Sequence, residues 1–179
     1  KWDILKKIRT TAMPAMMRLQ QFITELDSEE QTKIENPQLQ VRRDTFFKNR
    51  LVETPKSEFE ISEGEILVRI EKFAYTSNNI TYAAAGDMIG YWKFFPAAGQ
   101  YSEGWGVIPV WGFSEVIESN SEGIPVGDRF FGYFPPAKYL KMKPARIRDE
   151  QFIDGAAHRQ ELPSGYNMYR RVLNEKNYN

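Results

Sequence analysis

Three short segments rich in β-forming residues lie between residues 65 and 135, separated by Gly, Pro and Asn. In the first segment Ile66, Val68 and Ile70 recur at every second position and lie between charged residues, as in a strand with one buried face. The other two segments are GVIPVWGFSEVIES (106–119) and PVGDRFFGYFP (125–135). Short strands joined by such turns predict a small β-barrel or sandwich.

Both ends of the chain have helical spacing instead. Near the N-terminus, apolar residues recur every three or four positions, and Tyr166, Tyr169 and Val172 or Leu173 share one helical face near the C-terminus. We therefore expect an α+β fold that is mainly β. Its parts are a helical extension (1–40), a β domain (41–150) and a helical connector (151–179).

The N-terminal helix carries a basic side. A membrane-surface or partner-binding helix is one interpretation. We favour a docking helix with a solvated charged face, since most surface helices have this pattern. The basic residues are Lys1, Lys6, Lys7, Arg9 and Arg18.

Composition excludes several classes of function. The chain has 24 basic and 24 acidic residues and no cysteine. A nucleic-acid-binding protein usually has a basic excess, so we expect no nucleic-acid partner. The lack of cysteine excludes disulfides, thiolate nucleophiles and thiolate metal ligands. It also fits a reducing compartment, and we expect a cytoplasmic protein that does not bind membranes.

Three motifs follow one another in the order found in the medium-chain dehydrogenase/reductase superfamily. The first is EILVRIEKFAYTSNNITYAAAG (65–86), a strand and loop that end in a glycine. The second is IPVWGFSEVIES (108–119), which resembles a P-x-x-G-H-E segment, and the third contains Gly127-Asp128-Arg129. Residues 45–160 thus resemble the GroES-like N-terminal domain of that superfamily, which implies a partly open β-barrel flanked by helices.

The resemblance also indicates that the chain is zinc-independent. Zinc-dependent members place a cysteine ligand at the position of Ser77, a proton-relay hydroxyl at Asn79 and a histidine ligand at Phe113. The only histidine here is His158. Catalytic zinc needs three protein ligands, so we expect no metal site. The resemblance then implies a reductase that transfers hydride without metal to a carbonyl, enone or quinone-type substrate.

Within the superfamily the chain most resembles an uncharacterised branch, a domain of unknown function. Members of that branch carry a T-x-N-N-x-T-Y-A stretch, which here is residues 76–83. The later segment AAHRQELPSGYNMYRRV (156–172) resembles the His-Arg and Tyr-Asn-x-Tyr stretch of the same branch.

A metal-free reductase polarises its carbonyl substrate with hydrogen-bond donors. We expect Asn79, Thr81 and Tyr82 to be catalytic, on one loop, with Tyr82 able to donate a proton. The alternative is that Asn78 and Asn79 simply cap this loop.

Substrate-binding candidates are Ser77 and Asn78, together with three aromatic residues from a region dense in such side chains. Aromatic side chains line pockets for lipophilic ligands, although ordinary core packing is the interpretation that we favour. The three aromatic candidates are Trp92, Trp111 and Phe113.

The dinucleotide motif G-x-G-x-x-G is missing from the sequence. We therefore expect this chain alone to bind no cofactor and to be inactive, with NADP or NAD bound by a longer parent enzyme. His158 and Arg159 could contact a cofactor phosphate, by analogy only. The expected partner is a small lipophilic substrate, and a homodimer stays open. The alternative function is a non-catalytic binding or scaffold module with an aromatic apolar surface.

Overall fold

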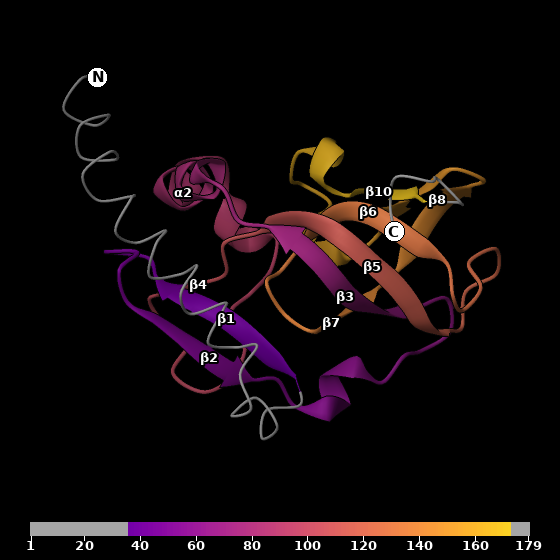
Figure 1. Cartoon of the computed structure of the whole chain (residues 1–179), viewed down its shortest axis with the longest axis horizontal. Helices are drawn as coiled ribbons and strands as arrows, with labels where there is room; N and C mark the ends of the chain where they lie inside the picture. Colours follow the sequence, from indigo (N-terminus) through magenta and orange to yellow (C-terminus); the bar gives the residue numbers. More distant parts are fainter. Residues whose placement is uncertain (1–35, 173–179) are drawn as a thin grey trace.

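The computed structural model describes residues 36–172 as a mainly β structure with two antiparallel sheets (Figure 1). A three-stranded sheet has the order β2-β1-β4, with β1 (Pro37–Arg42), β2 (Asn49–Glu53) and β4 (Trp105–Gly106). A seven-stranded sheet has the order β7-β3-β5-β6-β10-β9-β8. Its strands are β3 (Ile66–Ala74), β5 (Val110–Ser119), β6 (Arg129–Phe134), β7 (Tyr139–Met142), β8 (Pro144–Arg148), β9 (Gln151–Asp154) and β10 (Met168–Arg171).

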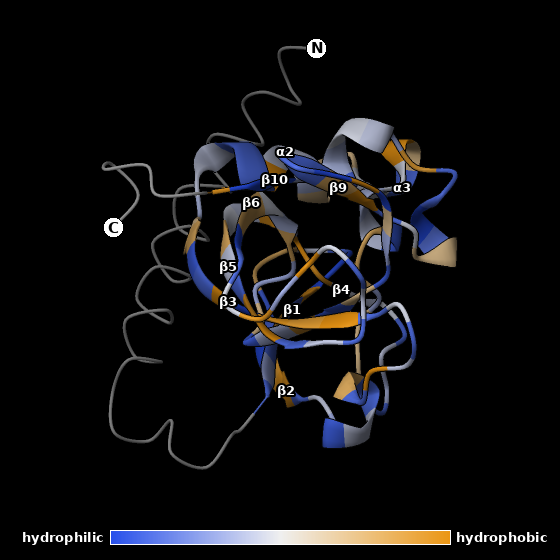
Figure 2. Ribbon diagram, turned by 90° about the vertical axis from the view of Figure 1, so that its right-hand side faces the viewer, coloured by the Kyte–Doolittle hydropathy of each residue, from blue (hydrophilic) through white to orange (hydrophobic). Residues whose placement is uncertain are grey.

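The larger sheet curls into a half-barrel. In Figure 2, β6, β5 and β3 follow an arc, and β1 and β4 lie on its concave side. The backbone joins the two sheets, because Leu39 N donates to Pro136 O at 2.9 Å and Lys138 N donates to Pro37 O at 3.3 Å. The antiparallel half-barrel confirms the expected mainly β class.

Helical segments in the described range are short. They are α2 (Ser77–Ala84), α3 (Gly86–Ile89) and the 3-10 helices η2 (Lys56–Phe59), η3 (Tyr91–Lys93), η4 (Ala157–Arg159) and η5 (Ser164–Tyr166). Among these residues, no helix is both long and apolar enough to span a membrane.

The alternation in the sequence predicts the central strands correctly. Along β3, Ile66, Val68 and Ile70 are buried, and a bulge between Ile70 and Lys72 then shifts the register with β5. Along β5, every second residue from Val110 to Val116 is buried. The turn before β6 places Gly127 at φ 92°, a left-handed conformation that glycine adopts without strain.

Two hydrophobic clusters form the interior. The first, here called the sheet core, fills the half-barrel and consists of Ile66, Val68, Ile70, Val110, Val116, Ile124, Phe130, Phe134, Met142, Phe152 and Tyr169. The second, here called the aromatic core, lies where the two sheets and α2 meet. It consists of Val41, Tyr82, Ala83, Tyr91, Trp92, Phe94, Phe95, Val107, Ile108 and Tyr133.

The predicted helical extension is wrong at its end. Residues 1–35 lie outside the described residues, but β1 begins at Pro37. Gln38 and Gln40 are polar residues of this strand. Both side chains are buried, and Gln40 Nε2 donates to Gln38 Oε1 at 2.7 Å and to Ala98 O at 2.8 Å. Hydrogen bonding thus lets polar residues occupy a buried strand.

The predicted helical connector is also wrong for residues 151–172, while residues 173–179 lie outside the described range. This segment adds β9 and β10 to the larger sheet, with η4 and η5 between them. The spacing of Tyr166 and Tyr169 suggested one helical face. Instead Tyr169 is fully buried on β10, and Tyr166 lies on η5 and packs against the aromatic core.

Candidate functional site

The loop expected to carry the catalytic residues is in fact the helix α2, and Asn79 caps it. Thr76 N donates to Asn79 Oδ1 at 2.7 Å, and Asn79 Nδ2 donates to Pro109 O at 2.7 Å. Asn79 is only 3% exposed. Its amide therefore starts the helix and binds it to the segment before β5, as in the capping alternative.

Tyr82 is the centre of a polar site on α2. Residues four apart share one face of a helix, and Asn78 Nδ2 donates to Tyr82 Oη at 2.9 Å. From β5, Trp111 Nε1 donates to the same oxygen at 3.3 Å. The Tyr82 ring is buried, whereas Asn78 is exposed and Trp111 is half-buried. Two N–H groups from different elements therefore converge on one phenol oxygen.

Tyr166 adds a second phenol to this site. Its hydroxyl lies 3.0 Å from the Tyr91 hydroxyl, and it also hydrogen-bonds with Tyr82. The bond to Tyr91, together with partial burial, raises the pKa of Tyr166 to about 12. Tyr166 is therefore a neutral phenol at physiological pH. Sequence reasoning missed it as a site residue, although it begins the Tyr-Asn-x-Tyr stretch.

The two stretches that resemble the uncharacterised branch thus meet at one place. Tyr82 comes from the first and Tyr166 from the second, more than eighty positions later, and their rings lie 6.3 Å apart. Tyr133 of β6 lies beneath both, with ring centroids 5.6 Å from Tyr82 and 4.7 Å from Tyr166.

Trp111 begins a row of aromatic side chains on the outer face of β5 and β6. Its ring stacks on Phe131 at 5.6 Å, and Phe131 contacts Phe113 at 5.1 Å. Phe131 is 36% exposed. The two aromatic candidates Trp111 and Phe113 are therefore joined through Phe131, a residue that sequence reasoning did not select.

Trp92, by contrast, is a packing residue. It is 7% exposed, and its ring lies so close to Gly86 and Gly106 that a Cβ at either position would overlap it. Arg43 covers the ring at 5.5 Å. We therefore do not include Trp92 in the candidate site. Gly86, the glycine that ends the first motif, leaves room for the Trp92 ring.

Ser77 and Thr81 lie on exposed positions of α2, and neither is among the residues that bond Tyr82. Ser77 is at the first position of the helix. Both side chains are reachable from solvent, and the structure gives neither of them a role in the Tyr82 site.

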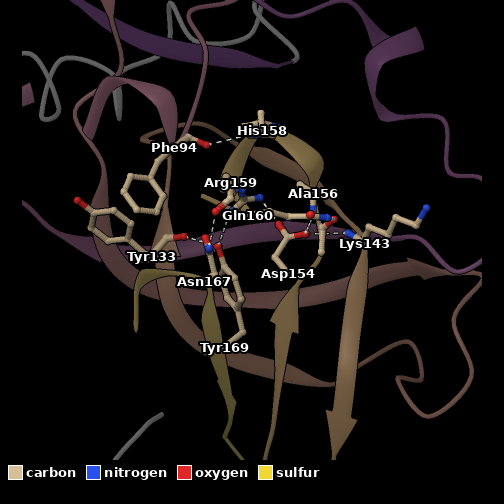
Figure 3. Close-up of polar contacts among 11 residues, drawn as sticks. Phe94, Tyr133, Lys143, Asp154, Ala156, His158, Arg159, Gln160, Asn167 and Tyr169 are labelled. Carbon is tan, nitrogen blue, oxygen red and sulfur yellow. Dashed lines mark hydrogen bonds and ion pairs between the residues drawn. The ribbon is translucent and has the colours of Figure 1, made fainter. Parts of the chain in front are cut away.

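His158 and Arg159 differ from the predicted cofactor contacts. Arg159 is 1% exposed and forms a buried ion pair with Asp154 (Figure 3). His158 Nε2 lies 3.2 Å from Phe94 O, and partial burial together with the Arg159 charge lowers the pKa of His158. A buried, paired guanidinium cannot contact a phosphate, so Arg159 does not fit the predicted contact with a cofactor phosphate.

Residues 36–172 bring no three His, Cys, Asp or Glu side chains together in a group that could hold a metal ion. The polar site is instead built from phenol, amide and indole groups. Such groups at neutral pH donate and accept hydrogen bonds without carrying charge.

The fold and site define a mainly β protein with a cluster of hydrogen-bonded tyrosines at the edge of the aromatic core. The chain belongs to the family described as "Protein of unknown function (DUF2855)", whose model matches residues 73–179. That range includes α2, β5, β6, η4 and η5, and therefore the whole Tyr82 site.

Among solved structures, a similar fold is found in a protein from Vibrio vulnificus. The crystal structure of CurA from Vibrio vulnificus is similar over 68% of this chain, with 17% sequence identity and a TM-score of 0.41. The chain spans about a third of the length of that neighbour, since 32% of it is covered. No curated protein matches the sequence.

Proposed function

We propose that this chain is the substrate-binding part of a zinc-independent NAD(P)H-dependent oxidoreductase, with a GroES-like domain that binds a carbonyl, enone or quinone-type substrate. The observation that carries the proposal is the convergence of Asn78 and Trp111 on the Tyr82 hydroxyl. The motif resemblance of residues 45–160 supports the superfamily, and the mainly β half-barrel is compatible with it.

The hydrogen-bond pattern suits a phenol that donates. Asn78 Nδ2 and the Trp111 indole are donors toward Tyr82, so they occupy lone pairs of its oxygen and leave its O–H to point elsewhere. A substrate carbonyl oxygen that accepts this O–H is polarised by it. When negative charge shifts to the Tyr82 oxygen, the same two N–H groups stabilise it.

The aromatic row supplies the apolar part of the site. Trp111 and Phe131 form a stacked pair next to the Tyr82 hydroxyl, and the ring centroids of Tyr166 and Trp111 lie 5.9 Å apart. Planar unsaturated compounds pack well on such rings. A neutral substrate also avoids the cost of burying a charge without a partner.

Arg159 forms an ion pair in the interior, so its guanidinium is not available for a phosphate of a nicotinamide dinucleotide. In this proposal the residues of this chain bind and orient the substrate and polarise its oxygen.

The test uses 1,4-naphthoquinone, a neutral planar dicarbonyl compound, as the probe. Binding is followed by quenching of tryptophan fluorescence in wild type, Tyr82→Phe and Tyr101→Phe. Tyr101 is 86% exposed on a loop and serves as the matched control. Loss of one hydrogen bond of about 1 kcal/mol weakens binding about fivefold in Tyr82→Phe and leaves Tyr101→Phe unchanged. Equal affinity in all three proteins contradicts a role for Tyr82.

The second candidate function is a non-catalytic module that binds an apolar ligand on the aromatic row. The stacking of Trp111 on the partly exposed Phe131 favours it. In this case Phe131→Ala weakens probe binding while Tyr82→Phe does not. The two variants therefore separate recognition by hydrogen bonds from recognition by surface alone.

A further inference from the structure

A buried polar network is linked to the Tyr82 site through Tyr169 and Tyr133. Arg159 and Asp154 are 1% and 2% exposed and form an ion pair. Asp154 Oδ1 also accepts Ala156 N at 3.0 Å and Lys143 N at 3.2 Å (Figure 3). The carboxylate therefore fixes the start of the segment that connects β9 to η4.

The segment that carries Tyr166 is bound once by the backbone carbonyl of Arg159 and once by its side chain. Asn167 Nδ2 donates to Arg159 O at 2.9 Å, and Arg159 Nη1 donates to Tyr169 Oη at 3.0 Å. These two partners lie one and three positions after Tyr166. The turn η5 completes the attachment, since Tyr166 N donates to Pro163 O at 3.1 Å.

The network also reaches the ring beneath the site. Tyr169 Oη donates to Tyr133 O at 2.5 Å (Figure 3). The Tyr133 ring then packs on Tyr166, on Trp111 at 5.1 Å and on Tyr82. The guanidinium of Arg159 is thus linked through the Tyr169 hydroxyl to Tyr133, whose ring packs on Tyr166 and Tyr82.

A buried ion pair adds little net stability, because the cost of removing both charges from water offsets their attraction. Apolar side chains of similar size often stabilise a fold equally well. Apolar contacts do not depend on direction, whereas each hydrogen bond of Arg159 and Asp154 requires its two groups to lie in one relative orientation. The arrangement of the network, more than its energy, therefore accounts for the placement of the segment.

We propose that Arg159, paired with Asp154, is a positioning residue that holds Tyr166 against Tyr82, and that Tyr166 is thereby a second ligand-contacting hydroxyl of the site. This proposal rests on the proposed function of the Tyr82 site. Without a ligand, the Tyr166 hydroxyl hydrogen-bonds with Tyr82 and Tyr91. When a carbonyl compound binds, Tyr82 and Tyr166 both turn their O–H groups to its oxygen.

The experiment compares the full chain with Arg159→Met/Asp154→Asn, Arg159→Lys and Arg171→Met. In the double variant the asparagine introduced at position 154 keeps an amide oxygen for Lys143 N and Ala156 N, while the ion pair is gone. Arg171→Met is the matched control, because Arg171 pairs with Asp128 and packs on Phe130, away from Tyr166.

The readout is the ionisation of Tyr166, followed by NMR of tyrosine labelled with 13C at Cζ and assigned with Tyr166→Phe. With a pKa of about 12, about one tenth of Tyr166 is ionised at pH 11 in wild type and in Arg171→Met. Release of the phenol toward its ordinary pKa raises this to about one half or more in the double variant. Naphthoquinone affinity falls about fivefold in the same variant.

A folded double variant with an unchanged Tyr166 resonance and ionised fraction overturns the proposal. If the double variant does not fold, Arg159→Lys decides. Its ammonium keeps a charge for Asp154 but lacks the fork that also reaches Tyr169, so Tyr166 is again expected to shift. An unchanged Tyr166 in folded Arg159→Lys likewise overturns the proposal.

The two proposals fail in different ways. If neither wild type nor any variant binds naphthoquinone but the ionised fraction of Tyr166 rises in the double variant, the positioning role stands and the proposed substrate class fails. If Tyr82→Phe weakens binding while the Arg159 variants leave both Tyr166 and binding unchanged, the site stands and the positioning role fails.

Discussion

The sheet core and the aromatic core contact the same strand, β6, yet they bury different chemistry. Phe130 and Phe134 of β6 belong to the sheet core, whose other members are mostly aliphatic. Tyr133 belongs to the aromatic core with Tyr82 and Tyr91. Buried aliphatic groups stabilise without direction, whereas buried hydroxyls need partners in fixed positions. We therefore expect the sheet core to contribute most of the stability and the aromatic core to contain the candidate site.

The largest expected effect tests the sheet core. Phe130→Ala removes a ring that is 1% exposed and packs on Phe152 at 4.8 Å. We expect it to lower the free energy of unfolding by about 3–5 kcal/mol, from lost burial and the cavity that remains. Urea denaturation followed by circular dichroism measures this loss.

The adjacent residue is the control for that substitution. Phe131 points to the opposite face of β6 and is 36% exposed, so Phe131→Ala is expected to cost about 1 kcal/mol or less. Similar losses for both variants contradict the assignment of Phe130 to the interior and Phe131 to the outer face.

The next effect separates two neighbouring asparagines at the edge of the aromatic core. Asn79→Ala leaves Thr76 N and the buried Pro109 carbonyl without their partner, and we expect a loss of about 2 kcal/mol. Asn78→Ala removes an exposed side chain and costs less than about 0.5 kcal/mol. Thermal unfolding of the two variants measures the difference, and equal melting temperatures argue against the capping role.

Sequence reasoning predicted the sheet core better than the site. Alternation in Ile66, Val68 and Ile70 identifies a strand because every second side chain faces one side. The same rule failed for β1, where Gln38 and Gln40 are polar but buried, and for residues 151–172, where a spacing of three suggested a helix. Long-range hydrogen bonds determine both of these segments, and local periodicity carries no information about them.

Only part of the candidate site was predicted, because some of its residues are brought together by long-range contacts. The T-x-N-N-x-T-Y-A stretch contains Asn78 and Tyr82, and Trp111 was selected for its aromatic surroundings. Tyr166 and Phe131 reach the site only through the fold, since η5 and β6 bring them to Tyr82 and Trp111. Trp92 was chosen as an aromatic residue, and only the two adjacent glycines show that it is a packing residue.

A smaller effect is expected at the centre of the aromatic core. Tyr82→Phe keeps the ring but removes the oxygen that accepts Asn78 and Trp111. Both donors lie on residues that are not fully buried, so water replaces part of the lost bonding. We expect a loss of about 1 kcal/mol in urea denaturation, with Tyr101→Phe unchanged. A loss as large as that of Phe130→Ala would show that Tyr82 is a structural residue first.

The smallest effect at neutral pH is expected for Tyr133→Phe, which does not lower the free energy of unfolding as the other substitutions do. The Tyr133 hydroxyl is buried without a hydrogen-bond partner among the described residues. Removing it abolishes a desolvation cost and keeps the ring contacts with Tyr82 and Tyr166. We therefore expect the free energy of unfolding at pH 7 to stay level or to rise by up to about 1 kcal/mol.

The same variant has a larger effect at alkaline pH. Burial raises the pKa of Tyr133 above the value of about 10 in an unfolded chain. Above pH 10 the unfolded state therefore loses a proton that the folded state keeps, and wild type loses stability as the pH rises. Tyr133→Phe lacks this proton, so its advantage over wild type is expected to grow from pH 7 to pH 10.5 or higher. Urea midpoints at the two pH values measure it. A constant difference would mean that the Tyr133 phenol reaches water, and the aromatic core would then be open beneath the Tyr82 site.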